Sequence, residues 1–124
     1  MKKKTIFIVD DDQMMTQMLS DHLSQNPLYE THTYGTGEEC IKDLALSPVA
    51  IVLDYKLNMN DPGAADGLEI LKRIKDIDEN ICVIMLSSQE QYGKALQTIA
   101  RGAMEYVIKD DKAFGKVAKI IASL

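Results

Sequence analysis

The sequence has no tryptophan, only two cysteines and no long apolar run, and each shortage excludes a class of protein. A membrane-spanning helix needs about 20 consecutive apolar residues, and residues 5–9, TIFIV, are too short for the core of a secretory signal. Cys40 and Cys82 show neither a CxxC pattern nor zinc-ligand spacing, so we expect two reduced thiols rather than a disulfide framework. These shortages predict a cytoplasmic protein that contacts no membrane.

Positive charge is scarce as well. The chain has 14 Lys and Arg against 19 Asp and Glu, a formal net charge of -5, and its one basic cluster is residues 2–4. Contact with nucleic-acid phosphates needs clustered Lys and Arg, so direct nucleic-acid binding is not expected. With 124 residues, 46% of them apolar and 27% charged, the chain has the size and composition of one globular domain covering residues 1–124.

Five short runs with strand character recur at even intervals. Four are continuous and rich in Val and Ile, which is typical of strands buried on both faces of a parallel sheet, and the fifth alternates like an edge strand. The continuous runs are TIFIV (5–9), VAIVL (49–53), ICVIML (81–86) and YVI (106–108), and the alternating run is YETHTY (29–34).

A segment with helical spacing of apolar residues follows each run. The predicted helices lie at 13–25, 36–47, 66–77, 90–102 and 111–124. Their apolar faces include Met14, Met18, Leu19 and Leu23 in the first helix, Leu68, Leu71, Ile74 and Ile77 in the third, and Leu96, Ile99 and Ala100 in the fourth, which closes at Gly102. The methionines are expected to fill the core. Five repeats of strand then helix predict an α/β protein, with a parallel sheet and helices on both faces.

Chemically active side chains stand where the strands end. They are Asp10, Asp11 and Asp12 after the first run, Asp54 after the run at 49–53, Ser87 and Ser88 after the run at 81–86, and Lys109 after the last. Asp12 is expected to cap the first helix. In an open parallel sheet the functional crevice lies at these carboxyl ends, so we expect the remaining side chains to meet there.

Crowded carboxylates repel one another and need a cation to stay ionised. Two or three of them at one point suit Mg²⁺, which keeps some positions open for water and phosphate. A carboxylate beside that ion can attack a phosphoryl group, while the lysine supplies positive charge and a serine hydroxyl donates a hydrogen bond. The residues therefore predict magnesium-dependent phosphoryl chemistry.

Four motifs in this order resemble the receiver domain of two-component response regulators, and the resemblance covers nearly the whole chain. They are VDDD (9–12), LD (53–54), LSS (86–88) and GAMEYVIK (102–109). The resemblance implies a flavodoxin-like (βα)5 fold with strand order 2-1-3-4-5. It also implies Mg²⁺ as cofactor, a histidine kinase or phosphotransfer protein as donor, and a downstream effector or output domain.

The roles of five residues follow from this resemblance. Asp54 is expected to be the phosphoacceptor and a metal ligand, with Asp11 as a direct ligand and Asp10 acting through water. The backbone carbonyl of Lys56 is expected to complete the metal ligands, and Lys109 to pair with the phosphoryl group. The chain would catalyse its own phosphorylation and dephosphorylation rather than turn over a substrate.

The expected output is a change of shape. The resemblance implies that the Ser87 hydroxyl turns toward the phosphoryl oxygens and that Tyr106 moves inward behind it, with the helix at 90–101 carrying the signal. A homodimer through the face of the fourth and fifth helices is one option. The chain is either a single-domain regulator or the front of a longer one.

Two features depart from the family pattern. Asp110 replaces the proline that usually follows the lysine, so the Lys109–Asp110 peptide is expected to be trans or locally strained, and Asp111 is a candidate cap for the last helix. The segment at 56–67 is several residues longer than usual. It is either a surface insertion or an edge of the site that affects kinase choice or phosphoryl lifetime. Lys56 and Gln89 are candidates to gate water to an acyl phosphate.

Two other functions stay open. VDDDQM also resembles the DxDx motif of haloacid-dehalogenase-type phosphatases, with Asp10 as nucleophile and Asp12 as general acid, although Asp54 then has no role. A receiver that binds partners without phosphorylation is the other alternative. His22 and His32 show no ligand spacing and are not proposed as phosphorelay histidines.

Overall fold

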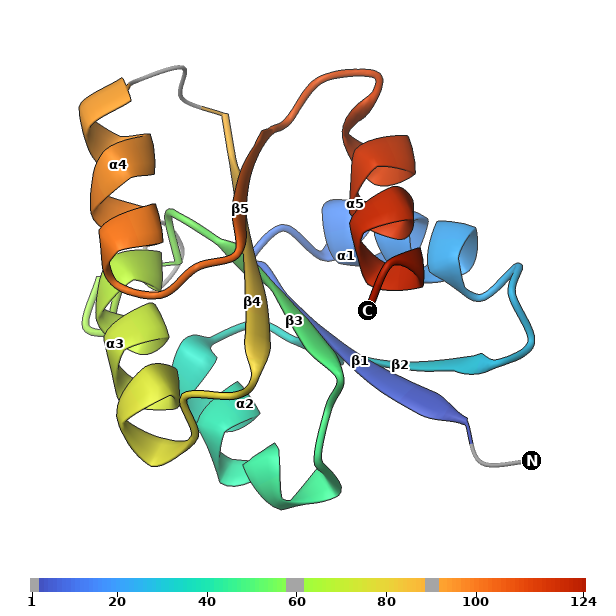
Figure 1. Cartoon of the computed structure of the whole chain (residues 1–124), viewed down its shortest axis with the longest axis horizontal. Coiled ribbons are helices and arrows are strands. Elements are labelled where there is room, and N and C mark those ends of the chain that lie inside the picture. The colour runs from blue at the N-terminus through green and yellow to red at the C-terminus, as the bar shows by residue number, and fades with distance from the viewer. Residues whose placement is uncertain (1–2, 58–61, 89–91) are drawn as a thin grey trace.

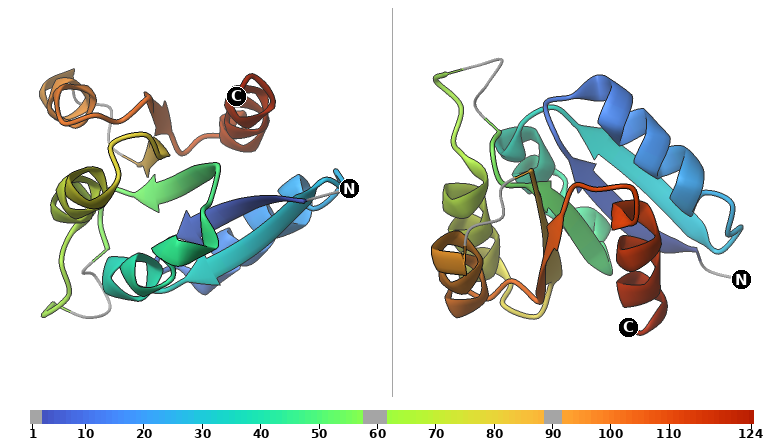
Figure 2. Two further views of the ribbon diagram at one scale, coloured as in Figure 1. Left: turned by 60° about the horizontal axis from the view of Figure 1, so that its bottom comes forward. Right: turned by 90° about the horizontal axis from the view of Figure 1, so that it is seen from above.

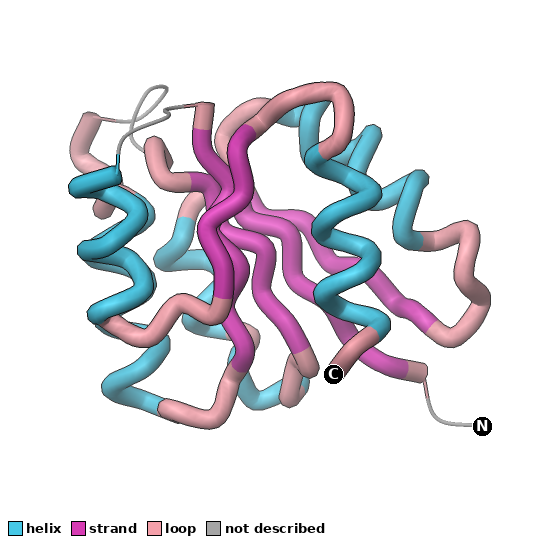
Figure 3. Tube along the Cα trace, turned by 45° about the horizontal axis from the view of Figure 1, so that its top comes forward, coloured by secondary structure: helices cyan, strands magenta, loops and turns pink. Residues whose placement is uncertain are grey.

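The computed structural model describes residues 3–57, 62–88 and 92–124. Five parallel strands form its central sheet, in the order β2-β1-β3-β4-β5 (Figures 1 and 3). They are β1 (Lys4–Val9), β2 (Tyr29–Tyr34), β3 (Ala50–Asp54), β4 (Cys82–Ser87) and β5 (Glu105–Ile108). Each end lies within one residue of the predicted run, and the strand order is the one that the resemblance implied.

The described residues form five α-helices and one short 3-10 turn, η1 (Leu44–Leu46). The helices are α1 (Gln13–Leu23), α2 (Gly37–Lys42), α3 (Gly67–Ile77), α4 (Tyr92–Ala100) and α5 (Ala113–Ala122). In Figures 1 and 2, α1 and α5 cover one face of the sheet and α2, α3 and α4 cover the other, which confirms the predicted layers. Within the described part of the chain, no helix is long and apolar enough to cross a membrane.

Side chains of β1 alternate between two apolar cores. Phe7 and Val9 pack in the core below α2 and α3, whereas Ile6 and Ile8 pack in the core below α1 and α5. Because β3 and β4 are divided in the same way, their residues are apolar at nearly every position. This double burial explains why the inner strands are continuous apolar runs.

Short polar residues set the helix starts. Asp12 caps α1 as predicted, and its carboxylate accepts hydrogen bonds from the backbone N–H groups of Met14 and Met15. Asp66 caps α3 through the N–H of Glu69. Gly102 follows α4 with a φ of 105°, a conformation that favours glycine and ends the helix where the sequence predicted.

The predicted apolar faces of α1 and α4 are wrong in part. Met14 and Met18 are 73% and 53% exposed, and Leu96 and Ile99 are 66% and 45% exposed. In α1 the buried apolar side chains are Leu19 and Leu23. Helical spacing identifies neighbours on a helix surface but does not determine which of two adjacent apolar stripes faces the sheet.

Candidate metal centre

The parallel register brings the predicted strand ends to one edge of the sheet. Val9 pairs with Leu53, which pairs in turn with Met85, and Ser87 pairs with Ile108. The next residues along the chain therefore stand beside one another, as predicted from the carboxyl ends of the strands.

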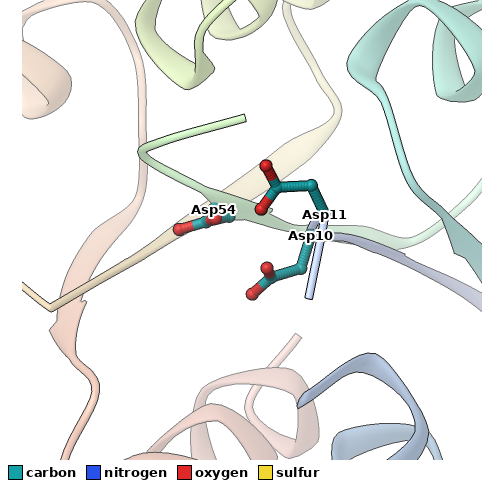
Figure 4. Close-up of side chains that lie close together, drawn as sticks. All are labelled: Asp10, Asp11 and Asp54. Atoms are coloured by element: carbon teal, nitrogen blue, oxygen red, sulfur yellow. The ribbon is translucent and has the colours of Figure 1, made fainter. Parts of the chain in front are cut away.

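Three aspartates form a compact acidic cluster at this edge. One carboxylate oxygen each from Asp10, Asp11 and Asp54 can be chosen so that all three lie within 4.8 Å of one another. Figure 4 shows the three carboxylates side by side, with Asp10 and Asp11 following β1 and Asp54 ending β3. Asp10 and Asp54 are buried and Asp11 is half-buried, so the cluster is open to solvent on one side.

Lys109 supplies positive charge to the cluster. Its Nζ lies 3.0 Å from Asp10 Oδ2 and 3.1 Å from Asp54 Oδ1, so one ammonium is shared between two carboxylates. Burial, with the charge of Asp10, raises the pKa of the Asp54 carboxyl to about 7, although Lys109 opposes the shift. Burial would lower the pKa of the Lys109 ammonium, but the charges of Asp54 and Asp10 outweigh it and raise that pKa.

The donor set fits a hard divalent cation such as Mg²⁺. Asp10 Oδ1 accepts a hydrogen bond from the N–H of Asp12 at 3.0 Å. Asp10 Oδ2 is buried and has the Lys109 ammonium nearby, but it accepts no hydrogen bond of good geometry. A buried carboxylate oxygen in this condition, next to two further carboxylates, is a ligand that Mg²⁺ can use.

Backbone hydrogen bonds tie the surrounding strand ends together. Lys109 N–H donates to the carbonyl of Ser87 at 2.7 Å, and Tyr55 N–H donates to the carbonyl of Leu86 at 3.0 Å. Ser87 itself is buried. Tyr106, on β5, is half-buried, and its ring lies edge-on to the ring of Tyr55 at a centroid separation of 6.4 Å. The predicted switch pair therefore lies on β4, which is next to β3, and on β5, the strand beyond it.

The Lys109–Asp110 peptide is trans, since the described residues contain no cis peptide bond. The predicted cap at Asp111 is wrong. α5 begins one residue later than such a cap requires, with Lys112 at the cap position and no side-chain cap. The carboxylate of Asp110 accepts the N–H of Lys112 at 2.9 Å instead, so it orders the turn that carries Lys109 into the helix.

The long connection after β3 is anchored at both ends. Leu57 is buried in the core, Gly67 N–H donates to the carbonyl of Tyr55 at 2.9 Å, and Ala65 N–H donates to Glu38 Oε2 at 3.0 Å. The Lys56 side chain is exposed, and the metal-ligand role of its carbonyl stays a prediction. The middle of the insertion, 58–61, and the water-gating candidate Gln89 lie outside the described residues.

An open groove lies next to Lys109, between the start of α1 and the start of α5. Its volume is about 370 Å³, and its lining is largely apolar: Met14, Met15, Met18 and Phe114, with Asp12, Lys109, Asp110 and Asp111 at the polar end. The sequence assigned these methionines to the core. Their position beside the acidic cluster was missed because it depends on how α1 and α5 meet.

Tyr55, Lys94 and Glu38 were also missed as residues of this region. Lys94 Nζ on α4 lies 5.4 Å from the centroid of the Tyr55 ring, and Glu38 binds a backbone 27 residues away. For Tyr55 the sequence did offer one signal, its position directly after Asp54. Successive strand residues point to opposite faces, so this position indicates a side chain near the cluster but on the other side of the strand.

The comparisons with known proteins agree with this fold. A family model described as the response regulator receiver domain matches residues 6–119. Sporulation initiation phosphotransferase F of Bacillus subtilis is 31% identical over 110 residues, which cover 88% of this chain and 84% of that protein. The BeF3-activated receiver domain of DrrB, a Thermotoga maritima protein, has a TM-score of 0.81 at 27% identity and covers 98% of this chain and 99% of that domain. This chain belongs to the response regulator receiver domain family.

Some relatives are longer than this chain. A protein-glutamate methylesterase/protein-glutamine glutaminase of Oceanobacillus iheyensis is 31% identical over 113 residues, which cover 88% of this chain but 30% of that protein. The chain thus spans under a third of that relative.

Proposed function

We propose that the chain accepts a phosphoryl group on Asp54 from the phosphohistidine of a kinase or phosphotransfer protein and signals through the resulting change of shape. The observation that carries this proposal is the position of Asp54. It is a buried carboxylate at a strand end, with two further aspartates within 4.8 Å and the Lys109 ammonium at 3.1 Å.

The chemistry assigns each side chain one task. An Asp54 carboxylate oxygen attacks phosphorus, the new P–O bond forms an acyl phosphate, and the P–N bond to the donor imidazole breaks. Lys109 can donate a hydrogen bond to an equatorial oxygen of the phosphoryl group if its ammonium gives up one of its two carboxylate partners, Asp10 or Asp54. When bound by Asp10, Asp11 and Asp54, Mg²⁺ would neutralise charge on the phosphoryl oxygens and the carboxylates. The same chain then acts on its own acyl phosphate, without a conventional turnover cycle.

The proposed switch is a biased equilibrium. Phosphorylation adds nearly two negative charges and three acceptor oxygens, to which Ser87 and Lys109 can donate. Converting a population from 1:99 to 99:1 takes about 5.5 kcal/mol. Hydrogen bonds to charged groups contribute about 1.5–3 kcal/mol each, so two or three suffice. Tyr106 follows Ser87 inward in this proposal.

The groove beside Lys109 is the proposed docking site for the donor protein. Asp54 is only 5% exposed, so a donor imidazole reaches it only if the donor's surface lies closely over the rim. Met14 and Met18 form the most exposed apolar part of this rim. Methionine side chains adapt readily to a partner's shape, and an exposed apolar patch of this kind marks an interaction surface.

The phosphatase alternative is less well supported by the site. Its general acid would be Asp12, but both described hydrogen bonds of that carboxylate go to the N-terminal amides of α1. A binding module that needs no phosphorylation would not require the partly buried cluster of three carboxylates and a lysine, whose assembly is energetically costly.

Labelling with acetyl phosphate tests the proposal. With Mg²⁺ present, the wild-type chain should incorporate labelled phosphoryl groups, and Asp54→Asn should abolish uptake. Asp10→Asn should slow uptake while leaving the label on Asp54. EDTA should suppress uptake by the wild-type chain. Label on Asp10 would instead support the phosphatase, and no uptake by the wild-type chain would leave the phosphorylation-independent module.

A further inference from the structure

Tyr55 follows β3 directly, and its ring contacts residues of two other elements, β5 and α4. It is in edge contact with Tyr106 of β5 at a centroid separation of 6.4 Å and an interplanar angle of 71°. The ammonium of Lys94, on α4, lies 5.4 Å from the centroid of the same ring. One side chain therefore contacts the predicted switch aromatic and the helix expected to carry the signal.

The backbone of Tyr55 gives this ring a fixed base. Its N–H donates to the carbonyl of Leu86 at 3.0 Å, and its carbonyl accepts the N–H of Gly67 at 2.9 Å. The ring packs against the core below α2 and α3. Burial raises the pKa of the Tyr55 hydroxyl, with Asp66 and Tyr106 adding to the shift, so the ring stays a neutral phenol.

Most of the α4 side chains that the structure describes lie outside the core. Among its described side chains Thr98 alone is buried, and its hydroxyl donates to the carbonyl of Ala95 in the same helix. Leu96 and Ile99 project into solvent. The first turns of α4 therefore depend on half-buried contacts, of which Lys94 over the Tyr55 ring is a cation–π contact.

We propose that Tyr55 is a positioning residue that couples Asp54 and Tyr106 to α4, and that its contact with Lys94 holds α4 in the observed position. This inference rests on the proposed function, because phosphorylation of Asp54 is the event that α4 would report. Movement of Tyr106 changes the packing of the Tyr55 ring, which weakens its hold on Lys94 and releases the helix toward its switched position.

Hydrogen exchange of the full chain, without phosphorylation, tests the contact. Tyr55→Leu removes the π-face and Tyr55→Phe keeps it, so the two variants form a matched pair. Tyr55→Leu should speed amide exchange in α4 by about three- to tenfold, while Tyr55→Phe stays near wild type and α5 is unchanged in both. Lys94→Met, which removes every contact of the ammonium, should resemble Tyr55→Leu and remains informative where Tyr55→Leu fails to fold.

The rate of phosphoryl uptake separates coupling from simple support. If the contact holds the unswitched position, Lys94→Met raises the switched population, so uptake from acetyl phosphate should be faster than in wild type. Loss of support alone would leave the rate unchanged or lower it. Equal α4 exchange in Tyr55→Leu and Tyr55→Phe, or unchanged uptake by Lys94→Met, would overturn the inference. A wild-type chain that takes up no label would refute the proposed function. The hydrogen-exchange comparison would still show whether the contact between Tyr55 and Lys94 holds α4, because it needs no phosphorylation.

Discussion

Gly67 begins α3 where the helix backbone lies close against the end of β3. A Cβ at this position would lie 2.2 Å from the carbonyl oxygen of Asp54 and 2.8 Å from the Cα of Tyr55. Both neighbours are backbone, so neither can rotate away. The absence of a side chain is therefore what allows the long connection to close next to the acidic cluster.

Gly67→Ala should lower the free energy of unfolding by roughly 1–3 kcal/mol, because the added methyl forces backbone to move. Gly115→Ala is the matched control, since a Cβ there meets nothing within 4 Å. Located inside α5, it should raise stability by about 0.5–1 kcal/mol. Urea denaturation measures both. A Gly67→Ala variant as stable as wild type would show that the backbone around Gly67 accommodates a methyl group without cost.

The hydrogen bond between Glu38 and Ala65 predicts a pH dependence. The Ala65 N–H lowers the pKa of the Glu38 carboxyl below its ordinary value of 4.5. Because the folded pKa is the lower one, the contribution of Glu38 to stability is present above about pH 4.5 and is lost as the pH falls below it. Glu38→Gln should therefore destabilise the protein more at pH 7 than at pH 3.5. Glu79→Gln controls for the loss of one charge, and an effect of Glu38→Gln that is equal at both pH values would contradict the assignment.

At the residue scale, the sequence predicted the side chains that follow strands but not those that connect distant segments. Asp10, Asp54 and Lys109 were found because the ends of parallel strands meet by geometry alone. The contact of Glu38 with Ala65 spans 27 residues and depends on where α2 and the connection after β3 come to rest. No local pattern contains that information.

The first helix shows what periodicity leaves undetermined at the scale of an element. The sequence predicted α1 within two residues at its end, yet assigned Met14 and Met18 to the core. α1 has two adjacent apolar stripes, and only the contact with the sheet and α5 decides which is buried. The same ambiguity affected Leu96 and Ile99 of α4. In α3 the predicted positions Leu71 and Ile74 are buried, but the buried Ile70 was missed.

Removal of the exposed methionine side chains should separate donor docking from phosphoryl chemistry. The double variant Met14→Ala/Met18→Ala should lower kcat/KM for transfer from a phosphorylated donor protein about tenfold, which corresponds to about 1.4 kcal/mol. Uptake from acetyl phosphate, which needs no docked protein, should stay near wild type. Ile77→Ala, at a 60% exposed position at the end of α3, is the matched apolar control. An equal loss with both phosphodonors would mean that α1 supports the site rather than the donor.

For the whole molecule, metal binding at the proposed site would be linked to folding, because the proposed ligands come from the separate segments that follow β1 and end β3. A cation bound only by the folded chain stabilises it according to its concentration. At tenfold the dissociation constant, Mg²⁺ should add about 1.4 kcal/mol and raise Tm by roughly 3–6 °C.

Asp11→Asn should remove most of this rise in Tm, whereas Asp76→Asn, an exposed acidic position on α3, should keep it. Differential scanning calorimetry at constant ionic strength measures the shift. A rise that persists in Asp11→Asn would mean that Mg²⁺ acts by screening the net charge of -5 rather than at the cluster.

The architecture of the whole molecule was the most predictable level. Continuous apolar runs at even intervals indicated strands covered on both faces, and the two cores on either side of the sheet are the physical reason. The strand order came from the resemblance, because apolar spacing alone does not rank neighbours in a sheet. The open groove between α1 and α5 was not predicted, since it exists only where two separately predicted helices meet.

The pairing of Tyr55 with Tyr106 also has an optical consequence. The chain has five tyrosines, two phenylalanines and no tryptophan, so its near-ultraviolet circular dichroism comes mainly from tyrosine in fixed surroundings. Two of those five rings form a T-shaped pair beside the acidic cluster. A change in their mutual angle would therefore alter the spectrum of the unlabelled protein and allow events at this edge of the sheet to be followed without a probe.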